Sequence, residues 1–186
     1  KEEMVNIFDT QIANSLLDKG LAYKCYCSVE DLRKEKEAAL KKKIPYKYSG
    51  KCRNIKEPLS DKFVLRIKVP NIGLLKLQDR IQGSVTVDYN NLEDFIILRS
   101  DNTPTYMLAV VVDDYVMNIS DIIRGDDHLT NTFKQIIIYN ALEWKIPKFS
   151  HIPLIYGPDG SKLSKRHGAQ SVLDYKKERF MPDALN

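Results

Sequence analysis

Residues 157–168 are the stretch best suited to chemistry, because cations, hydroxyls and glycines lie close together in it. Its three cations and two hydroxyls belong to Lys162, Lys165, Arg166, Ser161 and Ser164. Such a turn suits a polyphosphate, since lysine supplies a mobile positive charge. It is not a Walker A loop, because four residues separate the glycines of that motif and only two separate Gly157 from Gly160. A basic surface turn without a ligand is the alternative.

Three cysteines form a second candidate site. One residue separates Cys25 from Cys27, and 24 residues separate Cys27 from Cys52. Three soft thiolates suit zinc, which takes four ligands in a tetrahedron. Three unrelated thiols are the alternative. Because three is an odd number and too few for a disulfide scaffold, we expect a reducing, cytoplasmic location.

Arg124 and Tyr106 are candidates for binding a carboxylate. Arg124 follows a predicted strand and precedes a predicted helix, where its guanidinium can clamp a carboxylate through two hydrogen bonds. Tyr106 can donate a hydrogen bond from a rigid ring. The alternative for Arg124 is a structural salt bridge to Asp126 or Asp127, and the alternative for Tyr106 is packing in the core.

The charge of the chain is unevenly spread. Residues 30–56, called the basic segment below, hold ten basic and four acidic side chains, whereas the whole chain has a net charge of +4. Such a segment attracts nucleic-acid phosphates through the release of counterions. A solvated helix face is the alternative.

The first hundred residues are predicted to form a helix followed by a small α+β unit. Apolar residues recur at helical spacing over residues 4–19, before Gly20. A short strand is predicted at residues 23–26, and Ser28 is a predicted N-cap of a charged helix that ends near Lys43. Further strands are predicted where apolar and polar residues alternate or where short apolar runs occur, at residues 63–69, 74–77, 84–88 and 95–99.

The second half is predicted to form a parallel α/β sheet. The apolar run 105–112 is compatible with a helix or a strand. Buried strands are predicted at residues 119–123 and 152–155, with a helix between them that ends near Trp144. The glycine-rich turn then lies beyond the carboxyl end of the last strand, where open α/β sheets bind ligands.

Composition excludes several classes of protein. Of the 186 residues, 43% are hydrophobic and 29% are charged, which is typical of a folded domain rather than a disordered tail. No apolar run approaches the roughly 18 residues of a membrane span. No signal peptide is recognisable at the N-terminus.

The turn 162–166 reads KLSKR and resembles the KMSKS signature of class I aminoacyl-tRNA synthetases, in the form usual for bacterial glutamyl-tRNA synthetases. Further segments resemble that family in its order and spacing, at residues 23–27, 48–53, 104–106, 111–114, 123–128 and 131–132. The resemblance implies an α/β fold, namely the second half of a Rossmann-type nucleotide fold with an inserted α+β acceptor-binding domain. The corresponding parts are a helix at 1–20, the insertion at 21–99 and the nucleotide fold at 100–186.

The resemblance implies ligation of L-glutamate to tRNA-Glu, with ATP and Mg²⁺, through a glutamyl-adenylate. The family's KMSKS loop stabilises the charge that develops on the phosphates, a role that falls here on Lys165 with assistance from Lys162. The remaining ATP-binding residues by this match are Leu163, Ser164, Arg166, Asp127 and His128. Tyr106 and Arg124 match the residues that contact glutamate.

The resemblance also bears on the cysteines. Many glutamyl-tRNA synthetases have a Cys-x-Cys…Cys-x-His zinc site in the insertion, but Asn54 stands at the histidine position here. A tyrosine at the offset of Tyr48 is the fourth zinc ligand in the related glutamyl-Q-tRNA(Asp) synthetases. Either the site is degenerate and empty, or Zn²⁺ binds to a set that consists of Cys25, Cys27, Tyr48 and Cys52.

The family's HIGH motif is not found, since none of His128, His151 and His167 lies in such a sequence. We therefore expect a fragment of a longer enzyme, inactive on its own and without the anticodon-binding region. We expect a monomer whose basic segment approaches the acceptor arm of the tRNA. A glutamyl-Q-tRNA(Asp) synthetase is one alternative, although its KMSKS-like loop is typically degenerate. A non-catalytic, zinc-stapled RNA-binding module is an alternative of another class.

Overall fold

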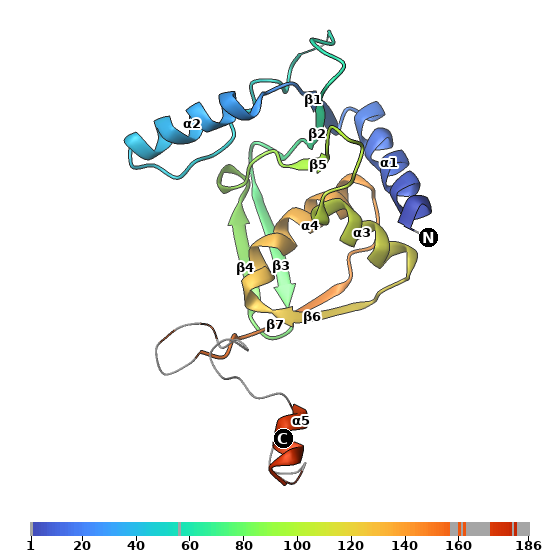
Figure 1. The fold of residues 1–186 in the computed structure, drawn as a ribbon, viewed down its shortest axis with the longest axis vertical. Coiled ribbons are helices and arrows are strands. Elements are labelled where there is room, and N and C mark those ends of the chain that lie inside the picture. Colours follow the sequence, from blue (N-terminus) through green and yellow to red (C-terminus); the bar gives the residue numbers. More distant parts are fainter. Residues whose placement is uncertain are drawn as a thin grey trace.

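The computed structural model describes residues 2–55, 57–156, 160, 162, 172–179 and 181. In this part of the chain, two small β-sheets and the helices around them form the fold (Figure 1). None of the helices within these residues is both long enough and apolar enough to span a membrane.

A three-stranded antiparallel sheet has the strand order β1-β2-β5. Its strands are β1 (Ala22–Cys25), β2 (Val64–Ile67) and β5 (Ile96–Leu98), each inside or overlapping a predicted strand. The helix α1 (Glu2–Asp18) precedes the sheet and packs against β1, as the spacing of its apolar residues predicts. The structure thus confirms the predicted helix and strands of this region.

The helix α2 (Val29–Lys41) begins at the predicted N-cap and lies at the periphery of the molecule (Figure 1). The Ser28 hydroxyl accepts a hydrogen bond from the backbone N–H of Asp31, at 3.1 Å, and the Asp31 carboxylate accepts one from the Ser28 N–H, at 3.0 Å. This reciprocal pair satisfies two N–H groups that the helix itself leaves free. No residue of α2 is fully buried, so its capping and ion pairs act together with the packing of the partly buried Leu32 against a cluster of Tyr23, Cys25, Tyr48 and Cys52.

A four-stranded mixed sheet has the order β4-β3-β7-β6. Its strands are β3 (Leu74–Asp79), β4 (Gly83–Asp88), β6 (Asp121–Gly125) and β7 (Lys148–Ile152). The strands β6 and β7 are parallel and are joined through the helix α4 (Leu129–Ala141), which confirms the predicted strand–helix–strand unit. The hairpin β3-β4 is antiparallel, and β3 pairs in parallel with β7 where Asp79 lies opposite Phe149.

The ambiguous apolar run is the helix α3 (Tyr106–Val116), which packs against α1 and α4. Its buried residues are Leu108, Val111 and Val112, which follow the i, i+3, i+4 spacing of one helix face. The remaining short helices are η1 (Tyr89–Asn91), η2 (Asp126–His128) and α5 (Val172–Lys177).

Three predicted details of the second half are wrong. The last strand is not 152–155 but β7, which stops at Ile152 because Pro153 has no N–H to donate. The strand β6 is not fully buried, since it is an edge of the described sheet and Ile123 is 67% exposed. The helix before β7 ends at Ala141 rather than near Trp144, because Glu143 adopts a left-handed φ of 57°.

The hydrophobic core crosses the predicted boundary at residue 99. Leu65 of β2, Leu77 of β3 and Phe149 of β7 belong to one cluster of buried side chains, together with residues of α1, α3 and α4. The division into 21–99 and 100–186 stays a prediction, but the two parts share this core and the mixed sheet.

We therefore predict that Leu77→Ala destabilises both parts together. Removing this buried side chain should cost about 2–5 kcal/mol, as for other core leucines. The sole tryptophan, Trp144, stacks on Tyr115 with ring centroids 3.7 Å apart and reports on the second part. In a urea titration, the midpoint from Trp144 fluorescence should fall as far as the midpoint from far-UV circular dichroism.

The matched control is Leu59→Ala, because Leu59 is 65% exposed and should leave both midpoints in place. A Leu77→Ala protein whose fluorescence midpoint is unchanged while circular dichroism shows an earlier transition would contradict a shared core.

Candidate functional site

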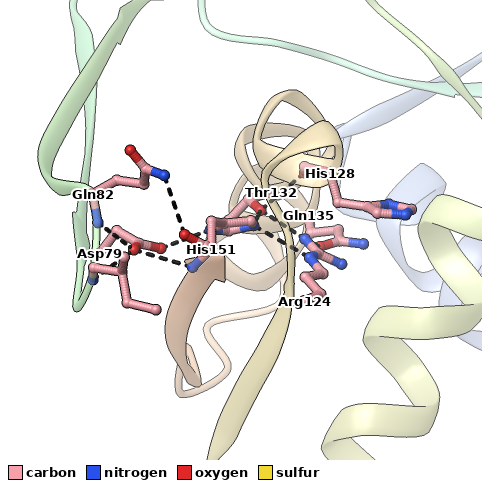
Figure 2. A network of polar contacts seen from close by, with 8 residues as sticks. Asp79, Gln82, Arg124, His128, Thr132, Gln135 and His151 are labelled. Carbon is pink, nitrogen blue, oxygen red and sulfur yellow. Dashed lines mark hydrogen bonds and ion pairs between the residues drawn. The ribbon is translucent and has the colours of Figure 1, made fainter. Parts of the chain in front are cut away.

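Three neighbouring strands carry a row of polar side chains on the sheet face that α4 covers (Figure 2). Asp79 ends β3, His151 lies in β7, and Arg124 lies opposite His151 in the β6–β7 register. Because side chains alternate along a strand, His151 shares its face with Phe149, and their rings are 6.0 Å apart and almost parallel. Sheet geometry therefore places a carboxylate, an imidazole and a guanidinium side by side.

Asp79 and His151 form a buried pair. The Asp79 Oδ2 and the His151 Nδ1 are 2.6 Å apart, and both side chains are inaccessible to solvent. The Asp79 Oδ1 accepts hydrogen bonds from the backbone N–H groups of Ile81 and Gln82, each at 2.9 Å. Burial by itself raises the pKa of Asp79, but the hydrogen bonds from Gln82 and His151 outweigh it and lower this pKa to about 2. Asp79 is therefore ionised at neutral pH.

Arg124 continues this network with three hydrogen bonds. Its Nε donates to the His151 Nε2 at 3.3 Å. Its Nη2 donates to the Thr132 hydroxyl at 2.6 Å and to the Gln135 Oε1 at 2.7 Å. Since a guanidinium only donates, the His151 Nε2 must carry a lone pair. The proton of a neutral His151 is then on Nδ1, facing Asp79.

The charge of Arg124 faces neutral acceptors. In the described part of the chain, the predicted alternative of a salt bridge to Asp126 or Asp127 is not formed. Burial lowers the pKa of Arg124, and the nearby Tyr106 and Asp114 oppose this effect. A partly buried cation whose hydrogen-bond acceptors are neutral attracts an anionic group, and a carboxylate fits its planar fork.

Tyr106 lies near Arg124 at the first turn of α3. The backbone before it is fixed, because the Thr105 hydroxyl donates to the Ile96 carbonyl at 2.9 Å and Arg99 Nη1 donates to the Pro104 carbonyl at 2.6 Å. Tyr106 is 49% exposed, so it does not pack in the core. Its ring centroid is 6.5 Å from that of His128. Tyr106, Arg124 and His128 are thus brought to one region.

Two of the predicted ATP-binding residues also meet. After β7 the chain turns back through a bridge between Tyr156 and Lys162, and Lys162 Nζ lies 2.6 Å from the Asp127 Oδ2. Gly125 permits this arrangement, since a Cβ at that position would lie 2.7 Å from Asp127 Oδ1. The predicted residues Leu163, Ser164, Lys165 and Arg166 lie outside the described residues.

The three cysteines and Tyr48 form a separate cluster on β1 and the loop before β2. The Tyr48 hydroxyl lies 3.2 Å from the Cys25 Sγ and 3.3 Å from the Cys27 Sγ, and the Cys27 and Cys52 sulfurs are 3.5 Å apart. All three sulfurs lie within 4.8 Å of one another. A zinc tetrahedron with Zn–S bonds of about 2.3 Å and a Zn–O bond of about 2.0 Å has edges of roughly 3.5–3.8 Å, so these donors fit the ion. Asn54 is exposed.

Arg66 supplies positive charge to this cluster. It is buried, and its guanidinium carbon lies 3.8 Å from the centroid of the Tyr48 ring. Burial raises the pKa of Cys27 to about 12. Burial also acts to raise the pKa of Cys25, but hydrogen bonds from Tyr48 and other neighbours outweigh it and lower that pKa. Negative charge in the cluster therefore resides first on Cys25, with Arg66 as its counter-charge.

Sequence reasoning missed Asp79, His151 and Gln135. The sequence did carry a signal for Asp79. Buried and exposed positions alternate along β3, and Leu75, Leu77 and Asp79 are its buried positions. The strand was predicted to end at Leu77, which left Asp79 unassigned. The hydrogen bonds to Arg124 join distant segments, and no local pattern indicates them.

Comparisons with known proteins identify relatives of the chain. The profile of the family described as tRNA synthetases class I (E and Q), catalytic domain, matches residues 6–186. Glutamate--tRNA ligase 1 of Ehrlichia canis (strain Jake) is 52% identical over 176 residues, and that of Gluconobacter oxydans (strain 621H) is 50% identical over 179 residues. These alignments cover 94% and 95% of this chain and 38% of each relative. The chain thus spans less than half the length of these relatives.

Among solved structures, a similar chain is a glutamate tRNA ligase from Elizabethkingia meningosepticum CCUG26117 in complex with its amino acid. The TM-score is 0.74 at 28% sequence identity. The match covers 88% of this chain and 36% of that chain.

We predict that the ionised Asp79 stabilises the fold in a pH-dependent way. Lowering its pKa from 3.8 in the unfolded chain to about 2 corresponds to about 2 kcal/mol of stability. This stability is fully present above pH 4 to 5 and is lost as the pH falls through the folded-state value. The difference in unfolding free energy between the wild type and Asp79→Asn should therefore shrink between pH 5 and pH 3, as measured by urea unfolding.

Asp61→Asn serves as the control, because Asp61 is exposed. This substitution should change the free energy of unfolding only slightly at every pH. A difference between the wild type and Asp79→Asn that stays constant down to pH 3 would show that packing, not the carboxylate charge, is responsible.

Proposed function

This chain belongs to the class I tRNA synthetases for glutamate and glutamine, and from that premise we propose that it contributes to ligating L-glutamate to tRNA-Glu with ATP. Its α/β architecture, with one antiparallel and one mixed sheet, matches the catalytic fold of that family. The observation that carries the proposal is the half-buried guanidinium of Arg124, whose three hydrogen-bond acceptors are neutral. Such a group is ready to bind a substrate carboxylate.

In this proposal Arg124 binds the side-chain carboxylate of glutamate, and Tyr106 donates a hydrogen bond to it from the first turn of α3. Discrimination against glutamine follows from charge, because a neutral amide does not compensate a partly desolvated guanidinium. Leaving that cation without an anion costs more here than in water, since burial already disfavours its charged form. The site thereby selects an acidic amino acid.

The proposed activation step forms a bond between the α-carboxylate of glutamate and the α-phosphorus of ATP. The bond between the α-phosphorus and the bridging oxygen breaks, and pyrophosphate leaves with its electron pair. Lys162 and Lys165 stabilise the negative charge on the phosphates, together with the Mg²⁺ that accompanies ATP. Lys162 pairs with Asp127 at 2.6 Å, so in this proposal the binding of a phosphate exchanges one anionic partner of Lys162 for another.

The basic segment is the proposed contact with the tRNA acceptor arm. Acidic residues of α2 neutralise part of it, as Arg33 pairs with Glu30 at 3.0 Å and with Glu37 at 3.4 Å. Ten basic residues against four acidic ones still leave the basic segment with a surplus of positive charge. This surplus favours a phosphate backbone.

We further propose that Cys25, Cys27, Tyr48 and Cys52 hold a structural Zn²⁺. The bound ion would link β1 to Tyr48 and Cys52, which lie in the basic segment itself, and so stabilise the lobe that carries this segment. The requirement for reduced thiols agrees with a cytoplasmic location. The Tyr48 position is also the observation that favours the alternative of a glutamyl-Q-tRNA(Asp) synthetase, whereas the relatives are named glutamate--tRNA ligases.

We predict that Lys165→Ala in the complete gene product lowers glutamate-dependent ATP–pyrophosphate exchange about a hundredfold or more, because the variant removes charge stabilisation of the transition state. The assay includes tRNA-Glu and compares glutamate with glutamine. Lys176→Ala is the matched control, since Lys176 is an exposed lysine of α5. An unchanged rate for Lys165→Ala, or equal exchange with glutamine, would refute the proposed function.

We predict one zinc ion per chain in protein purified without chelators. Tyr48→Phe should reduce zinc retention in competition with a chelator, because it removes the fourth donor and leaves three thiols. Tyr46→Phe, a nearby tyrosine outside the cluster, should retain zinc as the wild type does. Elemental analysis that finds no zinc in the wild type would exclude the site.

A further inference from the structure

We propose that Asp79 and His151 are positioning residues for Arg124, and that they set the affinity for the amino acid by fixing the direction of the guanidinium. This inference rests on the proposed function, because it gives Arg124 the substrate carboxylate as its ligand. It assigns a role to a buried pair that the activation step does not itself use.

The first step is the immobilisation of Asp79. Its Oδ1 accepts from the N–H groups of Ile81 and Gln82 in the turn between β3 and β4, and also from the N–H of His151 at 3.2 Å. The Arg80 N–H donates to the Phe149 carbonyl at 2.9 Å, so the same turn is held against β7. With both oxygens engaged, the carboxylate has one orientation.

The second step is the orientation of His151. Its Nδ1–H points to the Asp79 Oδ2, and its carbonyl accepts from the Gln82 Nε2 at 3.2 Å. The ring lies flat beside Phe149 and has no exposed surface. A carboxylate that holds the Nδ1–H fixes both the tautomer and the ring plane. The lone pair of Nε2 therefore points toward α4 and Arg124 (Figure 2).

The third step is the transfer of this order to Arg124. The bonds to His151, Thr132 and Gln135 all leave from Nε and Nη2, which form one edge of the guanidinium. Because the group is planar and rigid, anchoring this edge also fixes the direction of Nη1. Arg124 then meets a carboxylate without first losing side-chain freedom, and such preorganisation strengthens binding.

A purely structural role differs in what it predicts. If Asp79 and His151 only hold the β3-β4 hairpin against β7, their loss lowers stability and leaves the Michaelis constant for glutamate unchanged. If they position Arg124, the loss of the Nε2 acceptor weakens glutamate binding specifically, and ATP binding is retained. Two substitutions of the same histidine separate these cases.

The substitutions are His151→Asn and His151→Gln, made in the complete gene product. An asparagine amide can occupy the place of Nδ1 and keep a donor to Asp79, but it offers nothing at Nε2. A glutamine amide reaches the place of Nε2 and keeps an acceptor for Arg124. Both residues are neutral and polar, so the pair is matched in charge. The Michaelis constants for glutamate and ATP are measured by tRNA-dependent pyrophosphate exchange, and the melting temperature is measured in parallel.

We expect His151→Asn to raise the Michaelis constant for glutamate about tenfold, with that for ATP changed by less than about twofold. His151→Gln should raise the Michaelis constant for glutamate by less than about threefold. This difference between the two variants should not depend on which of them has the lower melting temperature. Equal constants for glutamate in both variants and the wild type, or parallel increases for glutamate and ATP, would overturn the inference while the proposed function stands. A wild type without glutamate-dependent exchange would refute the proposed function and the inference with it.

A second measurement does not depend on the variants folding. Nitrogen-15 NMR of the wild-type histidine rings should show His151 as the neutral Nδ1–H tautomer. A proton on Nε2 would leave no acceptor for the Arg124 Nε–H and would overturn the inference irrespective of the kinetics.

Discussion

The half-burial of one positive charge organises the described site. Removing a guanidinium from water costs on the order of several kcal/mol unless its donors find acceptors. Arg124 meets this requirement with an imidazole, a hydroxyl and an amide, all of them neutral. Its donors are thus satisfied while its charge is not cancelled by a bonded carboxylate. A site built in this way has a defined shape and retains its attraction for an anion.

The fold supplies these acceptors through alternation along strands and a covering helix. His151 lies beside Arg124 because the two residues are opposite each other in the parallel pair β6–β7, and their side chains point to the same face of the sheet. Thr132 and Gln135, which are three residues apart, lie on neighbouring turns of α4, so the helix presents both to one guanidinium. Asp79 completes the row from the other side of β7. A single carboxylate thereby fixes a histidine tautomer, and that tautomer makes the histidine an acceptor.

Much of the fold could be predicted from local patterns, whereas the polar network could not. Helical spacing and the Ser28 N-cap predicted α1 and α2, because both signals come from residues that are close in the sequence. The apolar run 105–112 is compatible with a helix or a strand, and only its packing between α1 and α4 decides for a helix. Asp79 and His151 are 72 residues apart, and their pairing depends on β3 joining β7. Neither residue lies in a recognisable motif.

This pairing also explains why the core is continuous across residue 99. Asp79 comes from the part predicted as an insertion, whereas His151 and Arg124 come from the part predicted as the nucleotide fold. A hinge between the two parts would separate a buried carboxylate from its only side-chain hydrogen-bond partner in the described residues, which is costly at low dielectric. The hydrophobic contacts of Leu77 with the shared core oppose the same movement. The strand β3, which ends in Asp79, therefore supports Arg124 through His151, whatever domain boundary is drawn through the sequence.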